Sequence, residues 1–357
     1  MEMMEIKEVR GKKTPGALIR DCLKERGISQ KEFALRMDLS EKHISRLINA
    51  EVQLTPDVAF RLEMVLGIAA KVWNSLEAEY RDSLLREQLL EGADDEQKVA
   101  ELFAYDELVS YGWIGAEESA IQRLTALRRF FEVAKLTSLR EHAVLKSASK
   151  SPDLHNREDL AALAWAQAGR MAARKIPVNA TNPCGLADMI PELRKMATAQ
   201  PEKFCSKLQK SLAKCGIALV FIPCPKGVLQ HGVTLLDGER TVIVFSTGDT
   251  DDNEFWFWLF HELGHISLGH VRQLRGTSMQ DEKDAHSWAR NMLISWKEFD
   301  SFKQQGDFSE QSICVFAKKQ GISPGIVVGR MQHDELIKTG SMNYLKELYE
   351  LEDYRTE

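Results

Sequence analysis

The segment at residues 255–270, which reads FWFWLFHELGHISLGH, constrains this chain more than any other stretch. Large apolar side chains would lie on nearly every side of a helix drawn through it, so that helix should be buried in a core. His261 and His265 lie one helical turn apart and would project from the same face. Buried polar groups need partners, so the fold must bring other polar groups to these two imidazoles.

Residues 261–265 form an H-E-x-x-H motif. Histidines at this spacing suit two corners of a tetrahedral zinc site. The glutamate beside the first histidine can deprotonate a zinc-bound water, because the metal lowers the pKa of that water to near neutrality. We therefore predict that His261 and His265 bind Zn²⁺ and that Glu262 is the general base of a peptidase. The alternative is a core helix whose histidines are only hydrogen-bonded.

Zinc needs a third protein ligand, and the acidic segment at residues 281–286, DEKDAH, offers Glu282, Asp284 and His286. Asp284 directly precedes the apolar positions of the helix that this segment opens, so we predict that it faces the metal helix. Glu282 and His286 remain possible replacements. His270 lies more than one turn past the second motif histidine, which indicates a surface or supporting role.

Length and composition indicate a globular protein of two or three domains, with 357 residues, 44% hydrophobic and 28% charged. The formal net charge of −6 is unevenly distributed. Residues 11–50 hold nine Lys/Arg and five Asp/Glu, a net of +4, whereas residues 77–107 hold three and eleven, a net of −8. This asymmetry favours a basic nucleic-acid-binding module followed by an acidic region.

Cellular location is predicted from the cysteines and from the apolar segments. The six cysteines are scattered and include no C-x-x-C pair, and no apolar signal segment follows Met1. No apolar run reaches the 18 residues that a membrane span requires. We therefore expect a reduced, cytoplasmic protein without membrane contact.

The basic N-terminal stretch shows four short helices with clear start signals. Ser29, Ser40 and Thr55 stand where N-cap residues belong, and Pro56 follows at the first helical position. Short helices joined by tight turns within a basic bundle indicate helix-turn-helix DNA binding, with the helix after Ser40 in the major groove.

Four side chains are predicted to contact DNA: Gln30, Lys42, His43 and Arg46. The three on the third helix would reach base edges or phosphates, and Gln30 would contact the backbone. The alternative is that these charges form an ordinary solvated face.

The whole chain is predicted to be multidomain and mainly α. We expect an all-α helix-turn-helix domain at residues 11–76, an acidic helical connector at 77–175 that is a candidate for dimerisation, and an α+β domain at 176–357. The last domain should hold three short strands, at residues 216–222, 232–236 and 241–245.

Asp237-Gly238 is a hairpin signal between the second and third strands, so we expect a small antiparallel sheet. An exposed strand edge at residues 241–246 could align an extended peptide across the metal.

Residues 11–68 resemble the lambda-repressor-like (XRE-type) helix-turn-helix of antitoxin-type repressors, including the entry to the fourth helix at Leu54-Thr55-Pro56. The resemblance implies a homodimeric repressor that binds a palindromic double-stranded DNA operator.

The run HELGHISLGH, followed by EKDAHSWARNMLI, resembles the ImmA/IrrE family of zinc metallopeptidases. That family implies a zincin-like fold and a regulatory protein, such as a repressor or antitoxin, as the substrate. Its third zinc ligand is usually a Glu beside an Ala, and Asp284 stands at the matching position here, which is a departure.

The tail GISPGIVVGRMQH is similar to the C-terminal helix of helix-turn-helix-fused members of that family. Its His333 is a candidate to stabilise the oxyanion of the reaction, although a lone histidine is more often structural. The competing hypothesis for the whole chain is a non-catalytic repressor or antitoxin. Its metal domain would then be a sensor or a surface that binds a cognate toxin.

Overall fold

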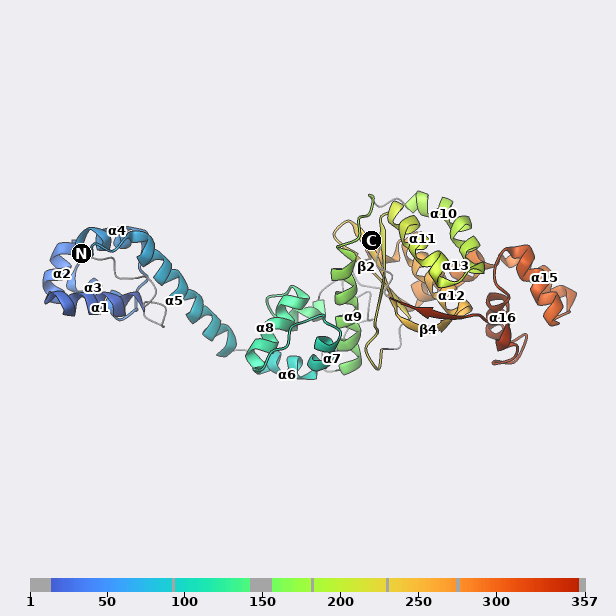
Figure 1. Ribbon diagram of the computed structural model, residues 1–357, viewed down its shortest axis with the longest axis horizontal. Coiled ribbons are helices and arrows are strands. Elements are labelled where there is room, and N and C mark those ends of the chain that lie inside the picture. Colours follow the sequence, from blue (N-terminus) through green and yellow to red (C-terminus); the bar gives the residue numbers. More distant parts are fainter. Residues whose placement is uncertain are drawn as a thin grey trace. The chain divides into compact units, whose positions relative to one another are not determined.

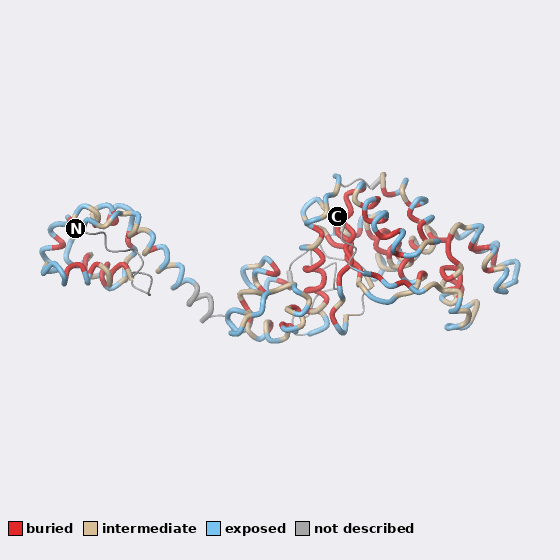
Figure 2. Tube along the Cα trace, in the orientation of Figure 1, coloured by how far each residue is buried: buried red, intermediate tan, exposed pale blue. Residues whose placement is uncertain are grey.

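A computed structural model describes residues 14–91, 94–141, 156–180, 183–228, 231–273 and 277–352 (Figure 1). The chain divides into two compact units, Met1–Asp94 and Asp95–Glu357. Each unit has its own cluster of buried apolar side chains, seen as the buried segments of the tube in Figure 2.

The first unit consists of α1 (Pro15–Arg26), α2 (Gln30–Met37), α3 (Glu41–Ile48), α4 (Pro56–Leu66) and α5 (Ala70–Glu91). The predicted caps are present, because the hydroxyls of Ser29, Ser40 and Thr55 accept hydrogen bonds from backbone N–H groups in the first turns of α2, α3 and α4. The apolar faces of these helices meet in one core. Helix α5 runs through residue 76, where we had expected the domain to end.

The second unit begins with short helices rather than with a continuous helical connector. They are α6 (Asp94–Leu102), α7 (Tyr105–Ser110), α8 (Ala120–Phe131), the 3₁₀ turn η1 (Leu136–Glu141) and the longer α9 (Arg157–Ala173). Helix α9 packs on the sheet, as Figure 1 shows. At Gly169 an added Cβ would lie 2.3 Å from the Val244 side chain of a strand. Residues 95–175 therefore belong with the second unit.

The sheet contains β1 (Ile217–Ile222), β2 (Gly232–Asp237) and β3 (Arg240–Ser246), in the order β1-β3-β2. The predicted strands are present, but the expected all-antiparallel sheet is wrong, because β1 pairs with β3 in parallel. The hairpin at Gly238 lays β2 antiparallel on one side of β3, which leaves the other side of β3 for β1. Strand β3 is therefore central and cannot supply the substrate-binding edge expected at residues 241–246.

The remaining elements surround the helix that carries the motif, α12 (Asp252–Ser267), which packs against β2, α13 and α16. They are α10 (Pro183–Lys195), η2 (Met196–Thr198), α11 (Pro201–Lys214), β4 (Gly248–Asp251), η3 (His270–Arg272), α13 (Met279–Leu293), α14 (Trp296–Gln305), α15 (Glu310–Gln320), α16 (Pro324–His333), η4 (Asn343–Leu345) and β5 (Leu348–Leu351). Strands β4 and β5 pair in a separate two-stranded sheet.

Helix α16 approaches the start of α12 very closely. A Cβ added at Gly325 would lie 2.2 Å from Asp252 Oδ1, and one at Gly329 would lie 2.0 Å from the Asn253 side chain. Asp252 is fully buried and accepts hydrogen bonds from the Ser323 hydroxyl and from the Asn253 backbone N–H. Burial is the main reason that the pKa of Asp252 is raised to about 6.

We predict that Asp252→Asn stabilises the protein increasingly as the pH rises. The folded-state pKa of about 6 lies above the usual aspartate value of 3.8, so Asp252 favours folding most below pH 4 and loses that contribution as the pH rises through 6. The stability gained by the variant should grow by up to roughly 3 kcal/mol between pH 4 and pH 7.5. Urea unfolding at several pH values measures this difference. Asp249→Asn, at an exposed position, is the control. A stability difference that stays constant with pH would contradict the assignment.

Candidate functional site

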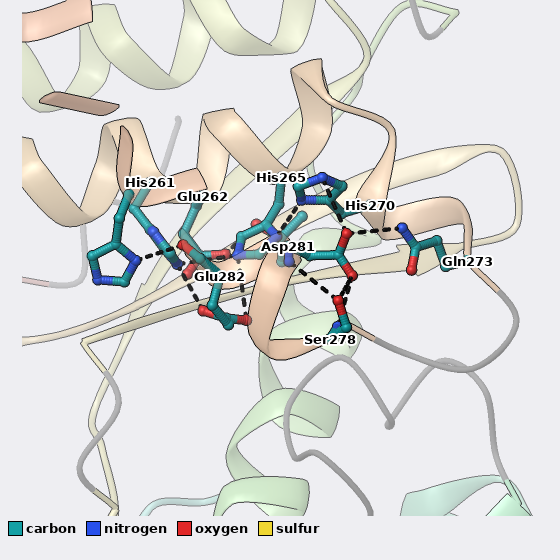
Figure 3. Close-up of polar contacts among 10 residues, drawn as sticks. His261, Glu262, His265, His270, Gln273, Ser278, Asp281 and Glu282 are labelled. Carbon is teal, nitrogen blue, oxygen red and sulfur yellow. Dashed lines mark hydrogen bonds and ion pairs between the residues drawn. The ribbon is translucent and has the colours of Figure 1, made fainter. Parts of the chain in front are cut away.

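Two helices bring His261, His265 and Glu282 together (Figure 3). The two Nε2 atoms of the histidines on α12 are 3.1 Å apart. The carboxylate of Glu282 on α13 lies 3.3 Å from Nε2 of His261 and 3.6 Å from Nε2 of His265. Gly264 permits this approach, because an added Cβ there would already lie 3.2 Å from the carbonyl oxygen of Ala285.

The three side chains form a donor set that could hold a divalent metal. Their nitrogen and oxygen atoms all lie within 4.8 Å of one another. Neighbouring donors around a tetrahedral zinc, each about 2.0–2.1 Å from the metal, are separated by roughly 3.3 Å, close to the spacing seen here. Two imidazole nitrogens and one carboxylate oxygen are also the combination found in catalytic zinc sites with an open position.

Asp284 does not face the histidines, so the expectation that it completes the set has to be corrected. It is exposed and accepts a hydrogen bond of 2.8 Å from Gln280. Two positions along a helix turn a side chain by about 200°, which places Asp284 and Glu282 on opposite sides of α13. Glu282, the alternative left open above, occupies the place beside the histidines. The histidines lower its pKa well below the ordinary range.

His286, the other alternative for the third ligand, contacts two members of the cluster. Its Nδ1 lies 2.7 Å from the carbonyl oxygen of Glu282 and can donate to it. The His286 ring packs 4.4 Å from that of His261, centre to centre, and is not one of the three grouped donors.

A chain of hydrogen bonds orients His265. Its Nδ1 lies 3.1 Å from Nδ1 of the buried His270, whose Nε2 lies 3.4 Å from Asp281. If Nε2–H of His270 faces the Asp281 carboxylate, Nδ1 of His270 accepts from Nδ1–H of His265. The Nε2 lone pair of His265 is then directed into the cluster. Burial acts to lower the pKa of His265, but the carboxylates of Glu282 and Glu262 raise it above its usual value.

Glu262 lies in the same cavity of about 220 Å³ as the three donors. Its carboxylate accepts a hydrogen bond of 2.5 Å from the hydroxyl of Thr234 on β2. A Cβ at Gly232 would be 3.3 Å from Cγ of Glu262 and 3.0 Å from the ring of Phe245, so the strand can lie this close because it has a glycine there. Glu262, the candidate general base on α12, is thus held against β2, an edge strand of the sheet.

Two further residues of this cavity, His231 and Trp258, had no distinguishing signal in the sequence. The rings of His231 and Trp258 stack with their centres 5.2 Å apart, and Trp258 meets the edge of the His261 ring. His231 precedes β2, so only the pairing of β2 beside α12 brings it to the cavity wall.

His333 does not line this cavity, which contradicts the role suggested for it. It lies at the end of α16 in a different cavity, beside Arg290. The reason is that α16 crosses α12 near Asn253, more than two turns before the first motif histidine.

In the first unit, three of the four side chains predicted to contact DNA are exposed on α2 and α3. Gln30, Lys42 and Arg46 are exposed, while the opposite face of α3 is buried in the core. Nε2 of His43 is buried without a hydrogen-bond partner among the described residues, so this nitrogen is not available to DNA.

A helix-turn-helix family model matches residues 19–73. An uncharacterized HTH-type transcriptional regulator of Escherichia coli (strain K12), YddM, is 35% identical over 63 residues, which are 18% of this chain and 67% of that relative. The chain belongs to the helix-turn-helix transcriptional regulators. The matched residues 19–73 lie within the first unit and include α3, the helix predicted to enter the major groove. Within the part of the chain that the structure describes, no helix is long and apolar enough to cross a membrane.

We predict that Arg46→Ala weakens binding of the regulator to its DNA site by about 1–3 kcal/mol, because an exposed arginine on α3, the predicted recognition helix, can contact a base edge or phosphate. Gel-shift titration on a site selected from random DNA measures the loss. Lys71→Ala, which removes an exposed charge from α5, is the matched control. Equal affinities of the Arg46 variant and the unchanged protein would show that α3 is not the recognition helix.

Proposed function

We propose that the second unit is a zinc-dependent endopeptidase that cleaves a regulatory protein, such as a repressor or an antitoxin. The observation that carries the proposal is the placement of Glu262 in one cavity with the His261, His265 and Glu282 donors. The fused DNA-binding unit favours a regulatory substrate over general protein digestion.

In this proposal each residue of the cavity has a separate role in the reaction. His261, His265 and Glu282 would hold Zn²⁺, which supplies a water of lowered pKa and polarises the substrate carbonyl. Glu262 takes the proton of the attacking water and passes it to the leaving amine. The Thr234 hydroxyl, bonded to one oxygen of Glu262, holds that carboxylate in place and leaves the other oxygen for the water.

Strand β2 is suited to align the substrate. The His231 carbonyl accepts a hydrogen bond from the N–H of Ser246 on β3. In an antiparallel pair alternate residues bond to the same partner, so Gly232 and Thr234 direct their backbone groups away from β3. These two residues also line the cavity. An extended peptide can therefore add to β2, in place of the edge first expected on β3.

The choice of Glu282 as ligand weakens the competing hypothesis of a non-catalytic metal domain. The shorter Asp284, as a departure from the family pattern, was an argument in favour of that hypothesis. With a glutamate facing both histidines, the donor set is the usual one for a hydrolytic zinc site.

DNA binding by this regulator is proposed to involve two copies on a palindromic operator. Helix-turn-helix proteins commonly bind two half-sites as symmetric dimers. Phe60 and Met64, adjacent on α4, are exposed by 57% and 63% and offer apolar surface for a second copy.

We predict that Glu262→Gln retains the metal and the DNA affinity but lowers peptidase activity by about 10²–10⁴-fold, because only the proton transfer is removed. The measurements are zinc content of the purified protein and cleavage of a protein that the variant retains on co-purification. Cleavage by the variant at the rate of the unchanged protein would exclude the peptidase mechanism.

The third ligand is tested by a matched pair of substitutions on α13. Glu282→Gln should lower zinc content at least tenfold, since the loss of a charged ligand weakens the site, whereas Asp284→Asn should leave it unchanged. Metal analysis after dialysis against a weak chelator measures both. If Asp284→Asn lost zinc and Glu282→Gln retained it, Asp284 would be the ligand instead.

A further inference from the structure

A second cavity, of about 100 Å³, lies among α12, α13 and α16 and is lined by two arginines. Arg290 comes from α13, and Arg330 comes from α16 together with His333. The other wall is apolar and includes Leu293 and Ile326. None of these residues lines the cavity of the metal donors.

Arg330 has hydrogen-bonding capacity that the described residues do not use. Its side chain is only 5% exposed, and its Nε donates to Asp334 at 2.9 Å. Nη1 and Nη2 are buried and have no partner among the described residues. The guanidinium carbon lies 4.3 Å from the centre of the Trp296 ring, so a flat face of the group is covered. Two buried N–H-bearing nitrogens without acceptors are costly and require an explanation.

The neighbouring charges offset only part of the positive charge at this cavity. An Arg290 terminal nitrogen contacts Nε2 of His333, whose Nδ1 lies 3.1 Å from Asp334. Asp334 is thus shared between Arg330 and His333. Burial and the charge of Arg330 both lower the pKa of Arg290, which indicates that the two guanidinium groups lie close enough to repel each other. Two permanent positive charges therefore face one carboxylate.

We propose that this cavity binds an oxyanion, a carboxylate or a phosphate group, through Arg330 and Arg290. The two terminal nitrogens of a guanidinium form a planar fork that matches a pair of carboxylate or phosphate oxygens. A bound anion would give the buried Nη1 and Nη2 of Arg330 their acceptors and would balance the second arginine. This site is independent of the peptidase proposal, because it shares no residue with the metal donors.

The proposal is tested by the thermal stability of the full-length protein in inorganic phosphate and in acetate, each compared with chloride at equal ionic strength. We expect a saturable rise in the unfolding temperature with at least one of the two anions. A rise with phosphate alone assigns phosphate as the ligand class, a rise with acetate alone assigns a carboxylate, and a rise with both assigns the shared oxyanion chemistry.

Substitutions locate the binding. Arg330→Gln should abolish the saturable rise, and Arg290→Gln should weaken the apparent affinity about tenfold through the loss of one charge-assisted contact. Arg129→Gln, at an exposed position on α8, should leave the affinity unchanged. If Arg330→Gln does not fold, the proposal is decided by the anion affinity of Arg290→Gln. The absence of a saturable rise, or a rise that persists unchanged in the cavity variants, overturns the proposal. The latter result would assign binding to another surface, such as the basic recognition helix.

Discussion

The candidate site depends on the close contact between α13 and α12 at Gly264. Because α12 is apolar on nearly all sides, its two histidines are committed to a core in which few polar partners are available. The absence of a side chain at Gly264 lets the backbone of α13 come near enough for Glu282 to reach both imidazoles. Without that carboxylate, two imidazole nitrogens 3.1 Å apart would face each other in the interior.

The first turn of α13 is fixed by its own side chains and also contacts the candidate site. The Ser278 hydroxyl and the Asp281 carboxylate form a reciprocal capping box, which fixes the first turn of the helix. Asp281 also contacts His270, which in turn faces His265. One local capping device therefore fixes where α13 begins and contributes to the orientation of a histidine on α12, so the helix boundary and the site geometry are linked.

The sequence predicted the features that are encoded locally, such as the N-caps at Ser29 and Ser40, the motif helix and the three strands. It did not predict what depends on the rotation or pairing of separate elements. The choice between Glu282 and Asp284 depends on the phase of α13 against α12, and apolar spacing alone left both possible. The parallel pairing of β1 was missed because the hairpin signal at Gly238 concerns only β2 and β3. His231 lines the cavity although nothing in the sequence distinguished it, and His333 lies outside it, because long-range packing decides both.

Helix α12 is supported along its length, and the supports differ in chemistry. Its first turn holds the buried carboxyl of Asp252, which accepts hydrogen bonds from the hydroxyl of Ser323 at the start of α16 and from the Asn253 backbone N–H. Its middle is held by α13, and Thr234 of β2 bonds to Glu262 on the remaining side. Site residues need partners that restrict their rotamers if the reacting groups are to be held within a fraction of an ångström. Contacts from separate elements restrict these side chains, because Thr234 bonds to Glu262, Glu282 faces both histidines and His270 faces His265. This arrangement is the preorganisation that the proposed reaction would require.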